Sequence, residues 1–168
     1  MNPRDYRLFV DLDGVLVDFD AGVRRATGRD PAELHPRSMW PVLAKTRDFY
    51  ANLEWMSDGR DLWDALRVFD PVILTGLPLG RWAEPQKRSW CTRELGNEVE
   101  VITGLSRHKA DLAAAWMEER NETDRTPLLI DDRLKVREPW EAAGGTFILH
   151  LNTAETLDAL ADLGFPVS

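Results

Sequence analysis

Five short apolar runs divide the chain and predict the strands of a sheet. They occupy residues 8–12, 72–75, 99–103, 128–131 and 146–150. Most positions in each run are apolar, which is typical of strands whose two faces are both buried, as they are in parallel sheets. The pattern therefore indicates a sheet that is covered on both sides.

The stretches between the later runs carry apolar residues at helical spacing. Three sets have this spacing: Leu62, Leu66 and Phe69; Leu112, Ala113, Trp116 and Met117; and Leu157, Leu160 and Leu163. Strand and helix alternate from about residue 57 onward, and this order calls for right-handed crossovers between parallel strands. We predict an α/β protein with a Rossmann-like, doubly wound, mainly parallel five-stranded sheet.

The interval of residues 19–56 breaks this alternation. It contains no predicted strand, and Pro31, Pro36 and Pro41 punctuate a partly helical stretch. An insertion directly after the first strand lies above the carboxyl ends of the strands, where ligands bind in open α/β sheets. We therefore predict a core domain of residues 1–18 and 57–168 and a small helical cap of residues 19–56.

Composition and charge narrow the class of protein and its partners. The chain has 168 residues, enough for one core, and its 43% hydrophobic and 30% charged residues are typical of a globular protein. The formal charge of -8 makes a nucleic-acid polymer a poor partner. We expect neither a signal peptide nor a membrane span, and hence a cytoplasmic protein. Cys91 is the single cysteine, which excludes an internal disulfide and a cysteine-built zinc site.

The first predicted strand leads into two acidic residues and a glycine. Asp11 and Asp13 lie at the strand terminus, and Gly14 lets the chain turn sharply there. Two carboxylates so close together require a cation. Mg2+ suits them because it prefers oxygen ligands and keeps waters that a phosphate can replace. Taken alone, the motif is equally compatible with two acids that cap a turn.

Three more strand ends carry polar groups toward the same edge of the sheet. Thr75 and Gly76 offer a hydroxyl and an unhindered backbone amide that can donate to a phosphate oxygen. Lys109, after the third predicted strand, supplies a positive charge, and Asp131 and Asp132 follow the fourth. An aspartyl-phosphate mechanism requires this combination of nucleophilic carboxylate, neighbouring acid/base, cation and hydrogen-bond donors.

With these residues the chain resembles the phosphatases of the haloacid dehalogenase (HAD) superfamily. The four motifs of that superfamily match here as Asp11-x-Asp13-Gly14, Thr75, Lys109 and Asp131-Asp132. The resemblance implies a HAD-type fold in which Asp11 attacks phosphorus, while Asp13 protonates the leaving oxygen and later activates water. It also implies that Thr75 and Lys109 hold the phosphoryl group.

The same resemblance implies a magnesium site. Asp11, the backbone carbonyl of Asp13 and one acid of the final pair would hold Mg2+. We expect Asp132 to contact the ion directly, with Asp131 behind it.

Within the superfamily, residues 11–19 resemble the 5'(3')-deoxyribonucleotidases, which dephosphorylate nucleoside monophosphates. Weaker similarities to that family occur at residues 39–40, 49–54, 86–90, 107–109 and 128–133. The resemblance implies that Phe19, Met39 and Trp40 bind the substrate beneath the cap, and that Lys87 is a second cation on the phosphate side. The family usually has serine and proline after the motif threonine, where this chain has Gly76-Leu77-Pro78.

The predicted function is therefore a magnesium-dependent phosphomonoester hydrolase, and specifically a 5'-nucleotidase acting on (deoxy)ribonucleoside monophosphates. An alternative is a phosphatase for sugar phosphates or other small metabolites, which shares the chemistry but not the aromatic pocket. A phosphoaspartate receiver domain uses similar residues, but its metal-binding acid pair lies on the first strand and its lysine comes last. An inactive binding module is a further alternative. The sequence leaves the oligomeric state open, with a homodimer as one option.

Overall fold

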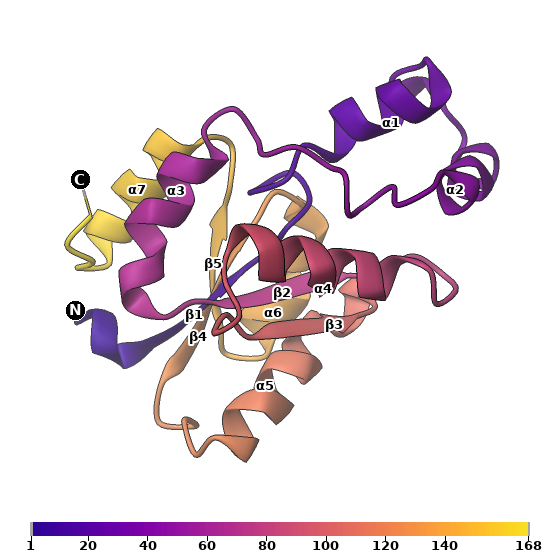
Figure 1. The fold of residues 1–168 in the computed structure, drawn as a ribbon. Helices are drawn as coiled ribbons and strands as arrows, with labels where there is room; N and C mark the ends of the chain where they lie inside the picture. Colours follow the sequence, from indigo (N-terminus) through magenta and orange to yellow (C-terminus); the bar gives the residue numbers. More distant parts are fainter. Residues whose placement is uncertain (1, 168) are drawn as a thin grey trace.

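The computed structural model describes residues 2–167 and contains a five-stranded parallel sheet (Figure 1). Its strands are β1 (Tyr6–Val10), β2 (Val72–Gly76), β3 (Val101–Gly104), β4 (Thr126–Asp131) and β5 (Thr146–Leu149). They lie in the order β3-β2-β1-β4-β5, and every pair of neighbours is parallel. Strands β2 and β3 lie on one side of β1, and β4 and β5 lie on the other side. This order confirms the predicted doubly wound α/β fold.

All five predicted strands are present, but the first ends earlier than its apolar run suggested. β1 spans Tyr6–Val10, and not residues 8–12. The strand ends because the carbonyl of Leu12 accepts hydrogen bonds from the backbone N–H groups of Val15, Leu16 and Val17. These bonds bend the chain into a tight turn. As a result, Asp11 follows the strand instead of lying within it.

Seven α-helices occur among the described residues. They are α1 (Phe19–Thr27), α2 (Pro36–Lys45), α3 (Gly59–Leu66), α4 (Ala83–Glu94), α5 (Lys109–Glu119), α6 (Arg137–Ala142) and α7 (Thr153–Asp162). None of the helices within residues 2–167 is both long and apolar enough to cross a membrane. Five short 3-10 helices complete the elements: η1 (Pro3–Asp5), η2 (Pro31–Glu33), η3 (Arg67–Phe69), η4 (Ser106–His108) and η5 (Leu134–Val136).

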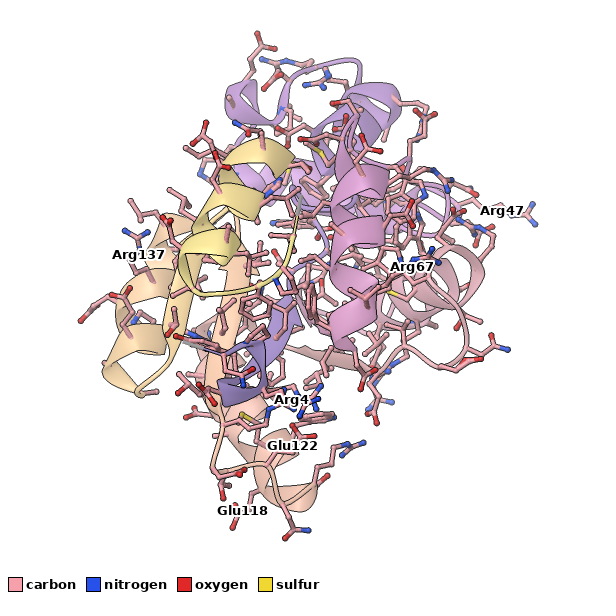
Figure 2. All side chains as sticks on the ribbon, turned by 90° about the vertical axis from the view of Figure 1, so that its left-hand side faces the viewer. Arg4, Arg47, Arg67, Glu118, Glu122 and Arg137 are labelled. Atoms are coloured by element: carbon pink, nitrogen blue, oxygen red, sulfur yellow. The ribbon has the colours of Figure 1, made fainter. Side chains whose placement is uncertain are left out.

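The sheet separates two hydrophobic clusters, because successive side chains along a strand point to opposite faces. Leu8 and Val10 of β1 pack in the cluster that contains α3, α4 and α7. Phe9, between them, packs in the other cluster with Ala113 of α5 and Trp140 of α6. The helices therefore cover both faces, as Figure 1 also shows. Charged side chains such as Arg67 project outward from this core (Figure 2).

Residues 19–56 leave the sheet after β1 and return before α3. They contain α1, η2 and α2 and contribute no strand to the sheet. An isolated bridge between Val17 and Trp55 joins the outgoing and returning chain. In Figure 1, α1 and α2 lie together beside the sheet. Met39 and Leu43 of α2 belong to the same hydrophobic cluster as Leu8 of β1.

A partly buried ion pair stabilises the end of the sheet that lies away from Asp11. The guanidinium of Arg7 on β1 donates to both carboxylate oxygens of Glu122, at 2.5 and 2.6 Å. Burial opposes ionisation of Glu122, but its hydrogen bonds to Arg7 and the charges of Arg7 and Arg125 lower its pKa below the usual value. Figure 2 labels Glu122 at the lower end of the molecule.

Replacing Glu122 with glutamine is expected to lower the free energy of unfolding by about 2 kcal/mol, because Arg7 loses the carboxylate that accepts two of its hydrogen bonds and keeps, among the described residues, only Asp70, at 3.7 Å, as a charged partner. Urea unfolding at pH 7 measures this loss. A carboxylate with a lowered folded-state pKa stabilises the fold above its unfolded-state pKa and loses that effect as the pH falls through the folded-state pKa. The difference between wild type and Glu122→Gln should therefore shrink below pH 4. Glu119→Gln, at an exposed position on α5, is the matched control and should change stability little.

Candidate active site

The turn after β1 brings two carboxylates to the carboxyl end of the sheet. The backbone N–H of Asp11 still donates to the carbonyl of Ile130 on β4, at 2.9 Å. Two residues later, Asp13 forms a bridge with Val17. Gly14 has a φ of 77°, in the left-handed region that favours glycine. The local sequence therefore makes a strand, a tight turn and two acids in immediate succession.

Lys109, the first residue of α5, joins the acids of β1 and β4. Its Nζ lies 2.8 Å from Asp11 Oδ1 and 2.6 Å from Asp131 Oδ2. The side chain of Lys109 is only 3% exposed, so its charge is paired within the protein. Burial alone would disfavour that charge, but the two carboxylates raise the pKa of Lys109 above its ordinary value. The lysine is therefore held as a cation between the two acidic strand ends.

Asp131 and Asp132 have different surroundings. Asp131 is fully buried, and its oxygens accept from Lys109 and, at 2.8 Å, from the backbone N–H of Arg133. Asp132 faces the pocket, where partial burial, together with Asp11 and Asp131, raises its pKa to about 7. Asp131 is thus committed to contacts within the protein, whereas the carboxylate of Asp132 remains available.

Gly14 allows the turn after β1 to approach Asp132 closely. A Cβ at residue 14 would lie 2.1 Å from Asp132 Oδ2, so no larger residue fits without a shift of one of the two. Glycine at residue 14 therefore suits both the left-handed backbone conformation and the close approach to Asp132.

Three carboxylates meet at one point and fit a hard divalent cation. Oxygens of Asp11, Asp131 and Asp132 all lie within 4.8 Å of one another. Counting Asp13 as well, this end of the sheet holds four carboxylates against the two buried lysines Lys87 and Lys109. The carboxylates therefore outnumber the lysines at this point. All-oxygen donors of this kind suit Mg2+.

Lys87 of α4 lies behind Asp13 and does not line the pocket. Its Nζ donates to Asp13 Oδ2 at 2.6 Å, to Thr75 Oγ1 at 3.0 Å and to the carbonyl of Gly76 at 2.8 Å. It also lies 4.4 Å from the ring centre of Tyr50. All three ammonium hydrogens are therefore used within the protein. The prediction that Lys87 is a cation facing the phosphate needs correction, because the lysine instead holds Asp13, Thr75 and Gly76 together.

Asp13 itself lies between the buried layer and the pocket. Burial raises its pKa, the charge of Lys87 opposes that rise, and Asp11 adds to it. Its second oxygen, Oδ1, is buried and has no hydrogen-bond partner among the described residues. A buried acceptor without a partner is costly, and this cost adds to the effect of burial in disfavouring the charged form of Asp13.

A pocket of about 400 Å³ opens above these groups, a size typical of small-molecule sites. It is lined by Asp11, Asp13, Gly14, Asp18, Phe19, Asp20, Trp40, Tyr50, Met56, Gly76, Leu77, Pro78, Ser106, Asp132 and Arg133. Residues from the carboxyl end of the sheet form one side, and residues from the 19–56 segment form the other. The predicted residues Phe19 and Trp40 are brought together here, with ring centres 5.9 Å apart.

Other predicted residues lie away from the pocket wall. Met39 is 8% exposed and packs in the hydrophobic core, so its predicted contact with substrate is not supported by its position. The hydroxyl of Thr75 and the amine of Lys109 lie one layer deeper than the lining residues, where they contact Lys87 and Asp11. Cys91 is buried, and burial raises the pKa of its thiol to about 12.

Several lining residues were not predicted. Tyr50 and Arg133 fell within segments that resemble the nucleotidases, so a signal for them was present. Asp18 and Asp20 are the sequence neighbours of Phe19, which was predicted to bind the substrate. Ser106 carried no such signal, because its place in the pocket depends on the pairing of β2 with β3.

Solved structures of HAD-like hydrolases have a similar fold. A haloacid dehalogenase-like hydrolase from Streptococcus pneumoniae is similar with a TM-score of 0.65 and 16% identity, covering 94% of this chain and 97% of that chain. A haloacid dehalogenase-like hydrolase from Xanthomonas campestris has a TM-score of 0.58 and 15% identity, with 95% and 92% covered.

A further structure, proposed to be a phosphoglycolate phosphatase from Lactobacillus plantarum, has a TM-score of 0.57 and 16% identity, with 100% and 94% covered. No family model and no curated protein matches the chain in sequence. The likeness therefore shows a HAD-like fold over nearly the whole chain.

Proposed function

We propose that the protein is a magnesium-dependent phosphomonoester hydrolase that works through a phosphorylated Asp11. One observation carries this proposal: Asp11 lies in a pocket beside Asp13 and Asp132, with its own charge paired to the buried Lys109. A carboxylate so placed has a cation behind it, a second acid beside it and a cluster of oxygen ligands around it. The HAD-like hydrolases among the similar structures support the same chemistry.

In the first step, a carboxylate oxygen of Asp11 attacks phosphorus and the bond from phosphorus to the leaving oxygen breaks. Asp13 gives its proton to that oxygen, so the product leaves as an alcohol. Burial raises the pKa of Asp13, which favours the protonated form that this step needs. Lys87 holds Asp13 in place through its 2.6 Å contact.

In the second step, Asp13 accepts a proton from a water molecule, and the oxygen of that water attacks the phosphorus bonded to Asp11. The bond between Asp11 and phosphorus breaks, inorganic phosphate leaves and Asp13 is again protonated. Mg2+ bound by Asp11, Asp132 and the carbonyl of Asp13 would neutralise charge on the phosphoryl oxygens. Between turnovers Lys109 pairs with the carboxylate of Asp11, at 2.8 Å from Oδ1.

We propose nucleoside monophosphates as the substrate class. The pocket lining contributed by residues 19–56 includes Phe19, Trp40 and Tyr50, and the ring of Phe19 stacks on that of Tyr50 at 6.1 Å. Aromatic side chains in such a lining can stack with a nucleobase. Asp18 and Asp20 also line the pocket and disfavour a leaving group that carries its own carboxylate. These residues support a flat, uncharged leaving group. The cap assigned to residues 19–56 would then select the substrate.

Sugar phosphates are the second candidate, because Asp18 and Asp20 could accept hydrogen bonds from sugar hydroxyls. A panel of ribonucleoside and deoxyribonucleoside monophosphates, sugar phosphates, phosphoglycolate and an aryl phosphate, assayed with Mg2+ and with EDTA, separates the candidates. We expect kcat/KM for nucleoside monophosphates to exceed that for sugar phosphates by at least about tenfold, since stacking of one base is worth about 1–3 kcal/mol. EDTA should abolish all turnover.

Trp40→Leu provides the control for that panel. It should lower kcat/KM for nucleoside monophosphates by about tenfold and leave the rate with sugar phosphates almost unchanged. Nucleotides turned over no better than sugar phosphates would rule out the nucleotidase assignment and favour the second candidate. Absence of hydrolysis of every compound, the aryl phosphate included, would contradict the phosphatase itself.

A further inference from the structure

Ser106 occupies the space that a side chain at residue 76 would fill. Thr75 pairs with Thr103 and Gly76 with Gly104, so the loops after β2 and β3 run side by side. A Cβ built on Gly76 would lie 2.2 Å from Ser106 Oγ, far closer than real contacts of this kind. The hydroxyl of Ser106 therefore lies directly over the backbone of Gly76.

The position of Ser106 makes its hydroxyl available to a ligand. Ser106 and Gly76 line the same pocket as Asp11. Ser106 Oγ accepts a hydrogen bond from Arg133 Nη1 at 3.0 Å, which fixes the oxygen. Within residues 2–167 this hydroxyl donates no hydrogen bond, so its own hydrogen is left to donate.

We propose that Ser106 donates a hydrogen bond to a phosphoryl oxygen of the substrate. Its hydroxyl thereby supplies a side-chain donor beside Gly76, which has no side chain of its own. The inference rests on the proposed phosphatase function and deepens it. A hydroxyl fixed by an arginine is a suitable donor to an anion, because hydrogen bonds to charged groups are stronger than neutral ones. Arg133 acts on this interaction as a positioning residue, through its contact with Ser106 Oγ.

The first test measures the affinity for inorganic phosphate in the presence of Mg2+ by calorimetry, independently of turnover. Ser106→Ala should weaken phosphate binding by about 10- to 100-fold, the value of one hydrogen bond to a charged group. It should also raise KM for an aryl phosphate more than it lowers kcat. Ser89→Ala, at an exposed position on α4, removes a hydroxyl elsewhere and should bind phosphate as the wild type does.

A pair of exchanged residues provides a second test that loss of stability cannot imitate. Gly76→Ser alone should also weaken phosphate binding, because its Cβ collides with Ser106 Oγ. Adding Ser106→Ala removes that oxygen and leaves the nearest Ser106 atom, Cβ, at an ordinary 3.4 Å. The double variant carries one hydroxyl on residue 76 in nearly the same place. It should bind phosphate more tightly than either single variant, a coupling expected only between interacting sites.

Wild-type phosphate affinity in Ser106→Ala overturns the inference, even if the enzyme hydrolyses phosphomonoesters as proposed. A double variant that binds phosphate no better than Ser106→Ala also overturns it. Failure of the wild type to hydrolyse any phosphomonoester instead contradicts the proposed function. The two failures are distinguishable because one concerns phosphate affinity and the other concerns turnover.

Discussion

Asp11→Asn is expected to lower kcat for an aryl phosphate by about 10⁴-fold or more. The amide oxygen of asparagine is a poor nucleophile and cannot form a stable acyl phosphate, so the first chemical step is lost. The substitution keeps the shape of the side chain, and the new amide would still offer an oxygen to Lys109, which lies 2.8 Å from Asp11 Oδ1. The loss should therefore appear in catalysis and only weakly in the melting temperature.

Acid-quench experiments with radiolabelled substrate test the covalent step itself. The wild-type protein should retain label that hydroxylamine releases, as an acyl phosphate requires, and Asp11→Asn should retain none. Asp61→Asn, at an exposed position on α3, is the matched control and should behave as the wild type. Label that persists in Asp11→Asn would assign the nucleophile to another residue.

Asp13→Ala is expected to slow both half-reactions, by about 10²- to 10⁴-fold, the usual range for loss of general acid/base catalysis. The alanine also removes the partner of Lys87, which lies 2.6 Å from Asp13 Oδ2. Asp13→Asn separates the two effects, because its amide oxygen can still accept from Lys87 while the residue can no longer transfer a proton.

The leaving group distinguishes proton transfer from a structural role of Asp13. A nitrophenolate leaves without protonation, whereas the ribose oxygen of a nucleotide must be protonated. In Asp13→Asn, kcat/KM should therefore fall at least about tenfold more for a nucleoside monophosphate than for 4-nitrophenyl phosphate. Equal losses with the two substrates would show that Asp13 does not protonate the leaving oxygen.

The carboxylates at the carboxyl end of the sheet are costly to bury, and the proposed ion would offset part of that cost. Asp131 is fully buried and Asp11 is only 4% exposed, and charges buried in this way are costly without compensation. Lys109 compensates for part of that cost at Asp11 and Asp131. Burial, together with Asp11 and Asp131, raises the pKa of Asp132 to about 7, so this carboxylate is costly to ionise. A divalent ion bound by Asp11 and Asp132 would offset that cost.

Much of the fold followed from the sequence by itself. The apolar runs predicted all five strands, because a strand buried on both faces must be apolar along its whole length. The residue types at the strand ends also predicted that Asp11, Lys109 and Asp131 would meet. Parallel strands deliver their carboxyl ends to one edge of the sheet, so the predicted parallel arrangement sufficed for that prediction.

Other features were decided only by the tertiary structure. Whether Lys87 faces a phosphate or lies behind Asp13 depends on how α4 packs, and periodicity within α4 does not contain that information. The burial of Met39 in the hydrophobic core likewise depends on how α2 packs. The contact between Ser106 and Gly76 joins residues of two different loops, and it arises from the register of β2 against β3. Local patterns determine the elements, whereas contacts between distant segments are determined by packing.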